Sequence, residues 1–311
     1  MEVELIKNIQ QGSTLFFDTF FKCVTFMGDK LFFVVVFCLL YWCYNKRFAF
    51  NFAIGCGVAA VSNSLLKVAF NRPRPYMADS NVVDYVHASG GSFPSGHSTL
   101  SAATSALLLC EVYTKKTSIK KYLKIILTAA LVVVSLLVGF SRMYLGQHYL
   151  SDVIMGLVCG AIVGIIWHKF CFIKNDREHI YALWLLPVLF GCLFIFVTEM
   201  FTSDMQHQDV YFLLGIAMAI IVGYYLEKRY IKLDLSINPA WFVIFKAVFG
   251  LGTTIGLYFL LNLLPSILIL ECVKGIILGI WASLVLMIIY KAISKRLLNT
   301  KTVEDKNANI K

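Results

Sequence analysis

Side chains suited to acid–base and anion chemistry gather in three short segments of the sequence. The segments span residues 67–75, 94–97 and 141–152. Among them we single out three cations, two histidines, one carboxylate, two small residues that begin an apolar run, and two prolines and a serine beside them. These residues are Lys67, Arg74, Pro75, Pro94, Ser95, Gly96, His97, Ser141, Arg142, His148 and Asp152.

The cations suit a ligand whose negative charge is spread over several oxygens. A phosphoryl group in transfer has this distribution, so its catalysis depends mostly on positioning and charge stabilisation. Arg74 and Arg142 offer planar forks that match phosphate oxygens, while Lys67 acts as a point charge. Ser95 and Gly96 begin an apolar run, and the free backbone amides of a helix start form an anion site. We expect these five residues to bind phosphate.

The two histidines suit complementary proton-transfer roles. His148 and Asp152 are four residues apart, which places them on one face of a helix. The carboxylate can hold one imidazole nitrogen protonated and leave the other as a lone pair, which orients His148 as a nucleophile. His97 is the candidate general acid, which protonates the leaving oxygen and later activates water. These roles need opposite protonation states, so we expect a bell-shaped pH profile.

Long apolar runs must position these segments. Hydrophobic residues make up 59% of the 311 residues and charged residues only 15%, against roughly a quarter charged in soluble domains. A helix needs about 20 apolar residues to cross a bilayer, and it satisfies its own backbone amides there. We predict an all-α, polytopic membrane bundle of about nine spans. We place the spans at about residues 29–45, 47–70, 97–114, 122–140, 149–170, 181–199, 209–227, 240–262 and 265–291.

Lysines and arginines in alternate loops predict the orientation. By the positive-inside rule the N-terminus lies outside and the C-terminus inside. Arg72, Arg74 and Arg142 fall on the outer side and break this rule, so we expect them to have another task. Each of the three segments lies where a span meets that outer face, which lets folding bring them together. The net charge of +10 fits orientation in a membrane better than nucleic-acid binding.

The set K-x6-R-P, P-S-G-H and S-R-x5-H-x3-D resembles the membrane-bound, bacterial-type members of the type 2 phosphatidic acid phosphatase (lipid phosphate phosphatase) family. This family shares its site with vanadium haloperoxidases. All three motifs are complete, and the resemblance covers about residues 28–172. It implies that His148 forms a phosphohistidine and that no metal or other cofactor is used. It also implies phosphate binding by Lys67, Arg74, Ser95, Gly96, His97 and Arg142.

The resemblance divides the chain into a phosphatase core and additional segments. Residues 28–172 form the expected core of five spans with the three motifs, and residues 1–27 mix apolar and polar positions as an interfacial amphipathic helix does. Residues 173–296 are expected to form accessory membrane helices, and residues 297–311 a tail. The extra spans exceed the minimal family pattern. Phosphatidate-like, isoprenoid diphosphate and sphingoid phosphate substrates all remain open, as does the oligomeric state.

We therefore predict an integral membrane hydrolase that acts on a lipid phosphate or diphosphate at the outer face of the cell membrane. A transporter or channel is one alternative, because Lys246, Glu271 and Lys274 fall within apolar spans. Glu271 and Lys274 are three residues apart and can neutralise each other, and Lys246 could pair with Glu271 across helices. A vanadate-dependent haloperoxidase is the other alternative.

One span carries a further signal of close helix packing. Gly156, Gly160 and Gly164 are four residues apart, so they form a smooth face on one helix. Such faces let two membrane helices approach closely. We interpret this stripe as a packing surface.

Overall fold

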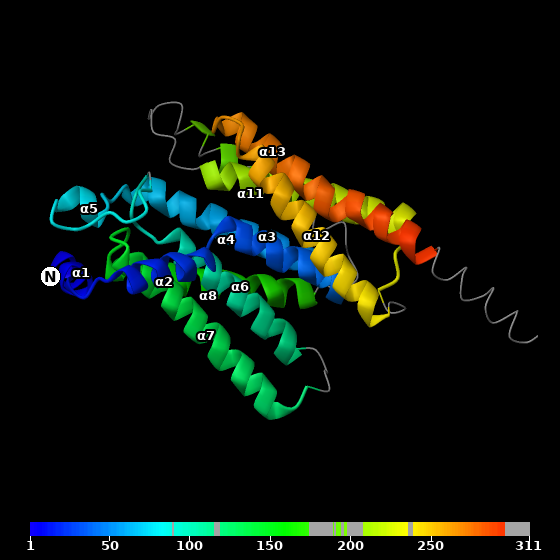
Figure 1. Ribbon diagram of the computed structural model, residues 1–311, viewed down its shortest axis with the longest axis horizontal. Helices are drawn as coiled ribbons and strands as arrows, with labels where there is room; N and C mark the ends of the chain where they lie inside the picture. The colour runs from blue at the N-terminus through cyan, green and yellow to red at the C-terminus, as the bar shows by residue number, and fades with distance from the viewer. Residues whose placement is uncertain are drawn as a thin grey trace, which may run out of the picture. The chain divides into compact units, whose positions relative to one another are not determined.

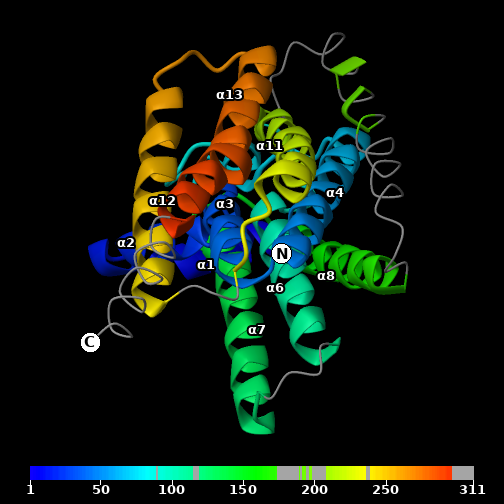
Figure 2. The ribbon, with the colours of Figure 1, turned by 90° about the vertical axis from the view of Figure 1, so that its right-hand side faces the viewer.

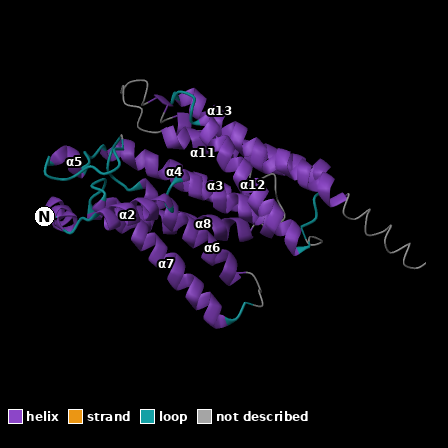
Figure 3. Cartoon of the chain, viewed as in Figure 1, coloured by secondary structure: helices purple, strands orange, loops and turns teal. Residues whose placement is uncertain are grey.

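The computed structural model consists of helices and the loops that join them. It describes residues 1–88, 90–114, 119–173, 189, 191–193, 196–197, 208–235 and 239–295. Every regular element in these residues is helical and none is a strand (Figure 3), so the predicted all-α class is confirmed. The predicted tail at 297–311 and most of the predicted span at 181–199 lie outside the described residues.

Six helices among the described residues are long and apolar enough to cross a membrane. A seventh span results if the pair Leu15–Phe26 and Lys30–Tyr44, bent by 53°, crosses as one. The count of nine is therefore not confirmed. The helix predicted at 97–114 exists but is not among the six, because serines and threonines are frequent in it. The six are Lys46–Ala78, Lys121–Tyr144, Leu150–Cys171, Val210–Ile231, Ala240–Leu261 and Leu268–Lys295.

The chain divides into two compact units. The first unit is Met1–Val34 with Asn51–Leu213, and the second is Val35–Phe50 with Leu214–Lys311. All residues singled out for phosphate chemistry belong to the first unit. Its helices are α1 (Glu2–Gln11), α2 (Leu15–Phe26), the start of α3 (Lys30–Leu39), most of α4 (Lys46–Phe70), α5 (Pro75–Ala78), α6 (Gly96–Thr114), α7 (Lys121–Tyr144), α8 (Leu150–Ile173) and the start of α11 (Gln208–Leu226) (Figure 1).

Helix α6 lies at the centre of the helices that carry the three segments. It packs against α7 and most extensively against α8, while α1 and α2 pack against α7 (Figures 1 and 2). The glycine stripe of α8 faces α6, as predicted. A Cβ atom on Gly160 would lie 2.1 Å from the Thr99 carbonyl oxygen, and one on Gly156 would lie 2.6 Å from the Ser95 carbonyl oxygen. Helix α8 therefore sets the position of the first turns of α6.

The second unit holds the buried charges of the apolar spans. It contains the rest of α3 with a π-helical turn at Leu40–Tyr44, the start of α4, and the rest of α11 with a π-helical turn at Glu227–Ile231. It also contains α12 (Ala240–Leu261) and α13 (Leu268–Ile280), which continues through a third π-helical turn at Trp281–Val285. The Lys274 Nζ atom lies 2.7 Å from the Glu271 carboxylate, so this predicted pairing is confirmed.

Lys246 is held differently from the expected pairing. Its Nζ atom donates to the Trp42 carbonyl oxygen at 2.7 Å and lies 5.4 Å from the centroid of the Phe242 ring. The suggested Lys246–Glu271 pair is wrong, because Glu271 is taken by a lysine one helical turn away on its own helix. These charges thus have partners within their own unit, which weakens the transporter alternative.

Candidate functional site

The first segment lies at the end of α4, and its cations bind the loop that leads to the second segment. Lys67 lies in the last turn of α4, and its Nζ atom donates to the Gly91 carbonyl oxygen at 2.6 Å. Arg74 is only 4% exposed, and its Nε atom donates to the Gly90 carbonyl oxygen at 2.9 Å. Pro75 begins α5, where its fixed φ suits a first helical position. The two cations of this segment therefore hold the loop that leads to the second segment.

The second segment begins α6 at Gly96, directly after Pro94, which follows a cis peptide bond, and the buried Ser95. The Ser95 backbone N–H donates to the Asp152 carbonyl oxygen at 3.0 Å, which joins this segment to the third. The Ser95 Oγ atom accepts from the Ser98 N–H at 3.4 Å, as an N-cap residue does. Asn63 of α4 donates to the Pro94 carbonyl oxygen at 3.3 Å. The start of α6 is thus fixed from both α4 and α8.

His148 lies in the loop between α7 and α8 and is 2% exposed. Its Nδ1 atom is 2.7 Å from the Ser92 carbonyl oxygen. A carbonyl oxygen can only accept, so we assign the proton of the neutral ring to Nδ1 and the lone pair to Nε2. The Nε2 atom lies 3.4 Å from Nη1 of Arg74. The Nε2 lone pair of the ring therefore faces a cation of the first segment.

The surroundings of His148 favour its neutral form. Burial lowers the pKa of His148 well below its ordinary value, and the positive charges of Arg74 and Lys67 act in the same direction. The hydrogen bond to Ser92 opposes this shift but is outweighed. At neutral pH the Nε2 lone pair is therefore present.

The expected direct hydrogen bond between Asp152 and His148 is not present. The His148 Nδ1 and Asp152 Oδ2 atoms are 3.7 Å apart, and the Ser92 hydroxyl donates to Asp152 Oδ2 between them. The Asp152 carboxylate also accepts from the Tyr149 backbone N–H at 2.9 Å and from Arg72 Nη1 at 2.8 Å. Ser92 therefore connects the two predicted residues, and our sequence interpretation missed it. No spacing rule marks Ser92, which is one small polar residue in a loop.

The third segment contributes a buried arginine at the end of α7. Arg142 is 4% exposed, and its Nη1 atom donates to the Thr25 hydroxyl of α2 at 3.0 Å. Its Nε atom is buried and has no hydrogen-bond partner among the described residues. The neighbouring Ser141 is fully buried, and its hydroxyl donates back to the Val138 carbonyl oxygen at 2.6 Å. Ser141 therefore supports the helix end, while Arg142 keeps a donor available.

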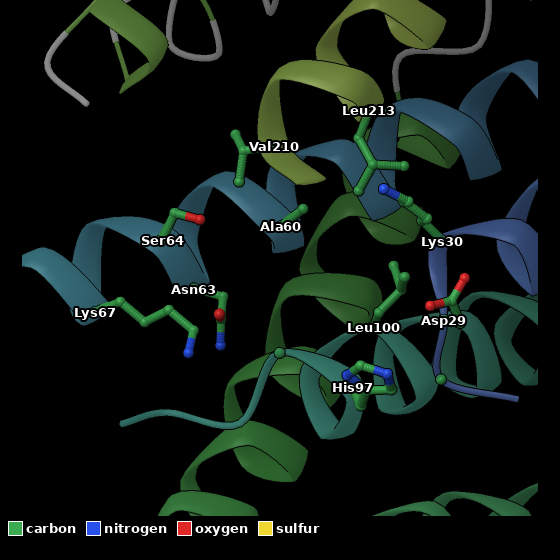
Figure 4. Close-up of a pocket in the computed structure, with 12 residues that line it drawn as sticks. Asp29, Lys30, Ala60, Asn63, Ser64, Lys67, His97, Leu100, Val210 and Leu213 are labelled. Carbon is green, nitrogen blue, oxygen red and sulfur yellow. The ribbon is translucent and has the colours of Figure 1, made fainter. Parts of the chain in front are cut away.

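A cavity of about 110 Å³ lies beside the end of α4 and the start of α6. Lys67, Asn63 and His97 lie at one side of it, and Val210 and Leu213 of α11 lie at the other (Figure 4). Gly96, at the start of α6, also lines it, as do the apolar side chains of Ala60 and Leu100. Asp29 and Lys30 line it as well. The cavity thus has charged and hydrogen-bonding groups together with an apolar side, as the site of an amphiphilic ligand does.

Comparison with known proteins identifies the region that carries the site. Residues 48–176 match the PAP2 superfamily. These residues form a PAP2 superfamily domain. The PAP2 domain contains all three segments, including Lys67, His97, Arg142, His148 and Asp152. With six or seven apolar helices suited to crossing a membrane, the chain is an integral membrane protein.

Two curated relatives of the PAP2 domain are named as phosphatases. A probable sphingosine-1-phosphate phosphatase of Dictyostelium discoideum is 28% identical over 170 residues, covering 53% of this chain and 41% of that protein. The undecaprenyl-diphosphatase BcrC of Bacillus subtilis (strain 168) is 29% identical over 136 residues, covering 42% of this chain and 64% of that protein. The alignments therefore span less than two thirds of either relative.

A solved structure is similar to about half of the chain. The crystal structure of Aquifex aeolicus LpxE matches with a TM-score of 0.47 and 25% sequence identity. The match covers 54% of this chain and 94% of the LpxE chain.

Proposed function

We propose that this membrane protein hydrolyses a lipid phosphate or diphosphate through a phosphohistidine intermediate. The observation that carries the proposal is the placement of His148, which is buried and held with Nδ1 at the Ser92 carbonyl oxygen and Nε2 toward Arg74. A histidine held in this way is an activated nucleophile. The nearby cations supply the charge that a transferring phosphoryl group needs.

In this proposal Lys67, Arg74 and Arg142 bind the non-bridging oxygens of the phosphate. The backbone N–H of Gly96, at the positive end of the α6 dipole, binds the same group. The unpartnered Nε of Arg142 supports its assignment, because a buried donor without a partner costs about 1–3 kcal/mol. Binding an anion would remove this cost.

The proposed chemistry has two steps. In the first, Nε2 of His148 attacks phosphorus, a P–N bond forms, and the bond from phosphorus to the leaving oxygen breaks. His97, protonated while the phosphate anion is bound beside it, gives its proton to that oxygen, and a lipid alcohol or a lipid monophosphate departs. In the second, water attacks phosphorus and gives a proton to neutral His97 while the P–N bond breaks. Orthophosphate leaves, and both histidines return to their starting states.

We propose that no metal takes part in these steps. Lys67, Arg74 and Arg142 neutralise the developing charge, which is the task that a metal ion has in many other phosphoryl transfers. Full activity in the presence of a chelator is the expected result. A chelator that abolishes turnover, with recovery on adding a divalent ion, contradicts this part of the proposal.

The substrate class follows from the cavity and the relatives. One relative is named for a sphingoid phosphate and the other for an isoprenoid diphosphate, so both kinds of head group belong in the first screen. The side chains of Val210 and Leu213 offer an apolar side for the first part of a lipid chain. The positive-inside rule supports a site on the extracytoplasmic face of the cell membrane.

Phosphate release by the purified full chain in detergent micelles tests the proposal. The panel contains phosphatidate, a sphingoid phosphate and an isoprenoid diphosphate. We expect release from at least one lipid, and loss of release in His148→Ala. Glu4→Gln is the control, because Glu4 is exposed on α1 and pairs with Lys7 at 2.8 Å.

Two outcomes would overturn the mechanism. Undiminished release by His148→Ala would exclude His148 as the nucleophile. Halide oxidation after adding vanadate, without release of phosphate from any lipid, would favour the haloperoxidase alternative. Simple inhibition by vanadate supports the phosphatase, since vanadate mimics the phosphoryl group in transfer.

A further inference from the structure

The side chain of Arg72 makes several contacts within the candidate site, although Arg72 is not one of the predicted phosphate ligands. Its Nη1 atom donates to Asp152 Oδ1 at 2.8 Å and to the Ser151 hydroxyl at 2.7 Å. Its guanidinium carbon lies 3.7 Å from the centre of the Tyr149 ring. The guanidinium fork of Arg72 is therefore directed at Asp152.

Glu2 of α1 holds the other side of the same guanidinium. Its Oε2 atom accepts from Arg72 Nη2 at 2.8 Å, and its Oε1 atom accepts from the Ser151 backbone N–H at 2.8 Å. Burial opposes ionisation of Glu2, but the hydrogen bonds from Arg72 and Ser151 outweigh it and lower its pKa. The Glu2–Arg72 ion pair therefore persists into mildly acidic solution.

Helix α1 is itself fixed against the loops of the site. Ile6 is fully buried in a cluster with Val82 and Tyr149. The buried Gln10 side chain donates to the carbonyl oxygens of Val83 and Tyr144, both at 2.9 Å. Glu2 therefore acts from a rigid support and not from a loose chain end.

We propose that Arg72, held by Glu2, is a positioning residue for the nucleophile. Arg72 fixes Asp152 Oδ1, and Asp152 Oδ2 accepts from the Ser92 hydroxyl. The Ser92 carbonyl oxygen in turn binds Nδ1 of His148 at 2.7 Å. This series of contacts connects α1 to the imidazole ring. The inference rests on the proposed function, because it assigns Arg72 a part in orienting His148 for attack.

Steady-state kinetics of variants in the full chain test the inference. Loss of orientation by about 1 Å costs about a hundredfold in rate, so Arg72→Ala should lower kcat by about tenfold to a hundredfold with little change in KM. Arg72→Lys should recover part of this loss, because a lysine reaches Asp152 as a point charge without the fork. Glu2→Gln should lower kcat by a few-fold. The matched control is Glu4→Gln on the same helix, which should leave kcat unchanged.

A double variant shows whether the two residues act in series. If Glu2 acts only through Arg72, the Glu2→Gln/Arg72→Ala protein has the same kcat as Arg72→Ala alone. Thermal melting of each variant monitors folding, and Arg72→Lys and Glu2→Gln retain polar groups in case Arg72→Ala does not fold.

Three results would overturn the inference. Arg72→Ala with unchanged kcat removes any role in orientation. A raised KM with unchanged kcat assigns Arg72 to phosphate binding. Full additivity of the two substitutions shows that Glu2 does not act through Arg72. A wild type that releases no phosphate from any lipid refutes the proposed function and this inference with it, whereas an active wild type with unaffected variants refutes the inference alone.

Discussion

A single methyl group on α8 should impair the site without touching a charged residue. Gly156 lies in the stripe that faces α6, one helical turn beyond Asp152. In Gly156→Ala, the new Cβ atom would lie 2.6 Å from the Ser95 carbonyl oxygen and 3.0 Å from Ser98 Cβ. The first is a backbone atom directly before α6 and the second a Cβ atom of its first turn, so neither can move away by a side-chain rotation.

The size of the effect follows from these distances. An ordinary van der Waals contact begins at 3.4 Å, so the Ser95 carbonyl must withdraw by about 0.8 Å. The adjacent Gly96 N–H belongs to the proposed phosphate site and moves with it. A misplacement of about 1 Å costs about a hundredfold in rate, so we expect kcat to fall by about tenfold to a hundredfold. Overpacking adds a loss of about 1–3 kcal/mol in stability.

Two further glycine variants separate activity from stability. Gly164→Ala places a Cβ atom 2.9 Å from the Ala103 carbonyl oxygen, two turns farther from the site, so it should lower the melting temperature with a smaller loss of kcat. Gly57→Ala in α4 meets nothing within 4 Å and should gain up to about 1 kcal/mol from helix propensity. Phosphate release and thermal melting of the three proteins are the measurements. If Gly156→Ala has the kcat of the wild type, the close contact between α8 and Ser95 does not position the site.

Three other predictions follow from the hydrogen bonds and charges of the site. Ser92→Ala keeps the hydrogen bond between the backbone carbonyl and His148 but removes the one to the Asp152 carboxylate, which is worth about 1.5–3 kcal/mol. We expect kcat to fall at least about tenfold. An unchanged kcat would show that Ser92 does not orient His148 and Asp152. The pKa of His148 is lowered from 6.5, so its Nε2 lone pair persists below that pH. The acidic limb of the kcat/KM profile should therefore lie below pH 6.5 with both a monoester and a diphosphate substrate. An acidic limb at or above pH 6.5 contradicts the assignment of His148 as neutral. Gln10→Leu removes the side-chain amide that donates to the Tyr144 carbonyl oxygen, and it should lower the free energy of unfolding by about 1–3 kcal/mol, measured by thermal melting. The control Gln11→Leu, at an exposed position, should have little effect.

The meeting of the three segments could be predicted from the sequence because membrane spans restrict topology. A span that begins near Gly96 and spans that end near Lys67 and Arg142 must share one membrane face if they alternate in direction. The structure brings Ser95 of the second segment to Asp152 of the third, at 3.0 Å between backbone atoms. The glycine stripe was predictable for a similar reason, since spacing by four residues defines a helix face.

The link between His148 and Asp152 could not be predicted in the same way. The expected direct contact assumed that both residues share one helix, but α8 begins only at Leu150. His148 therefore lies in the preceding loop, where helical spacing does not apply, and Ser92 occupies the space between the two side chains. Ser92 is 56 residues away in sequence from His148. Contacts at such a separation depend on tertiary packing and leave no periodic signal.

The environment of the cations explains why the site needs residues outside the three motifs. Asp152 is the one carboxylate within the motifs, and its oxygens are taken up by Arg72, Ser92 and the Tyr149 N–H. Lys67 and Arg74 are oriented by the carbonyl oxygens of Gly91 and Gly90. A carbonyl oxygen fixes the direction of a cation but leaves its formal charge in place, so these cations remain attractive to an anion. A carboxylate in the same positions would cancel that attraction. Arg72, Ser92 and the Tyr149 N–H thus hold the Asp152 carboxylate, while carbonyl oxygens orient Lys67 and Arg74. This division of partners accommodates a buried carboxylate and several buried cations in the same candidate site.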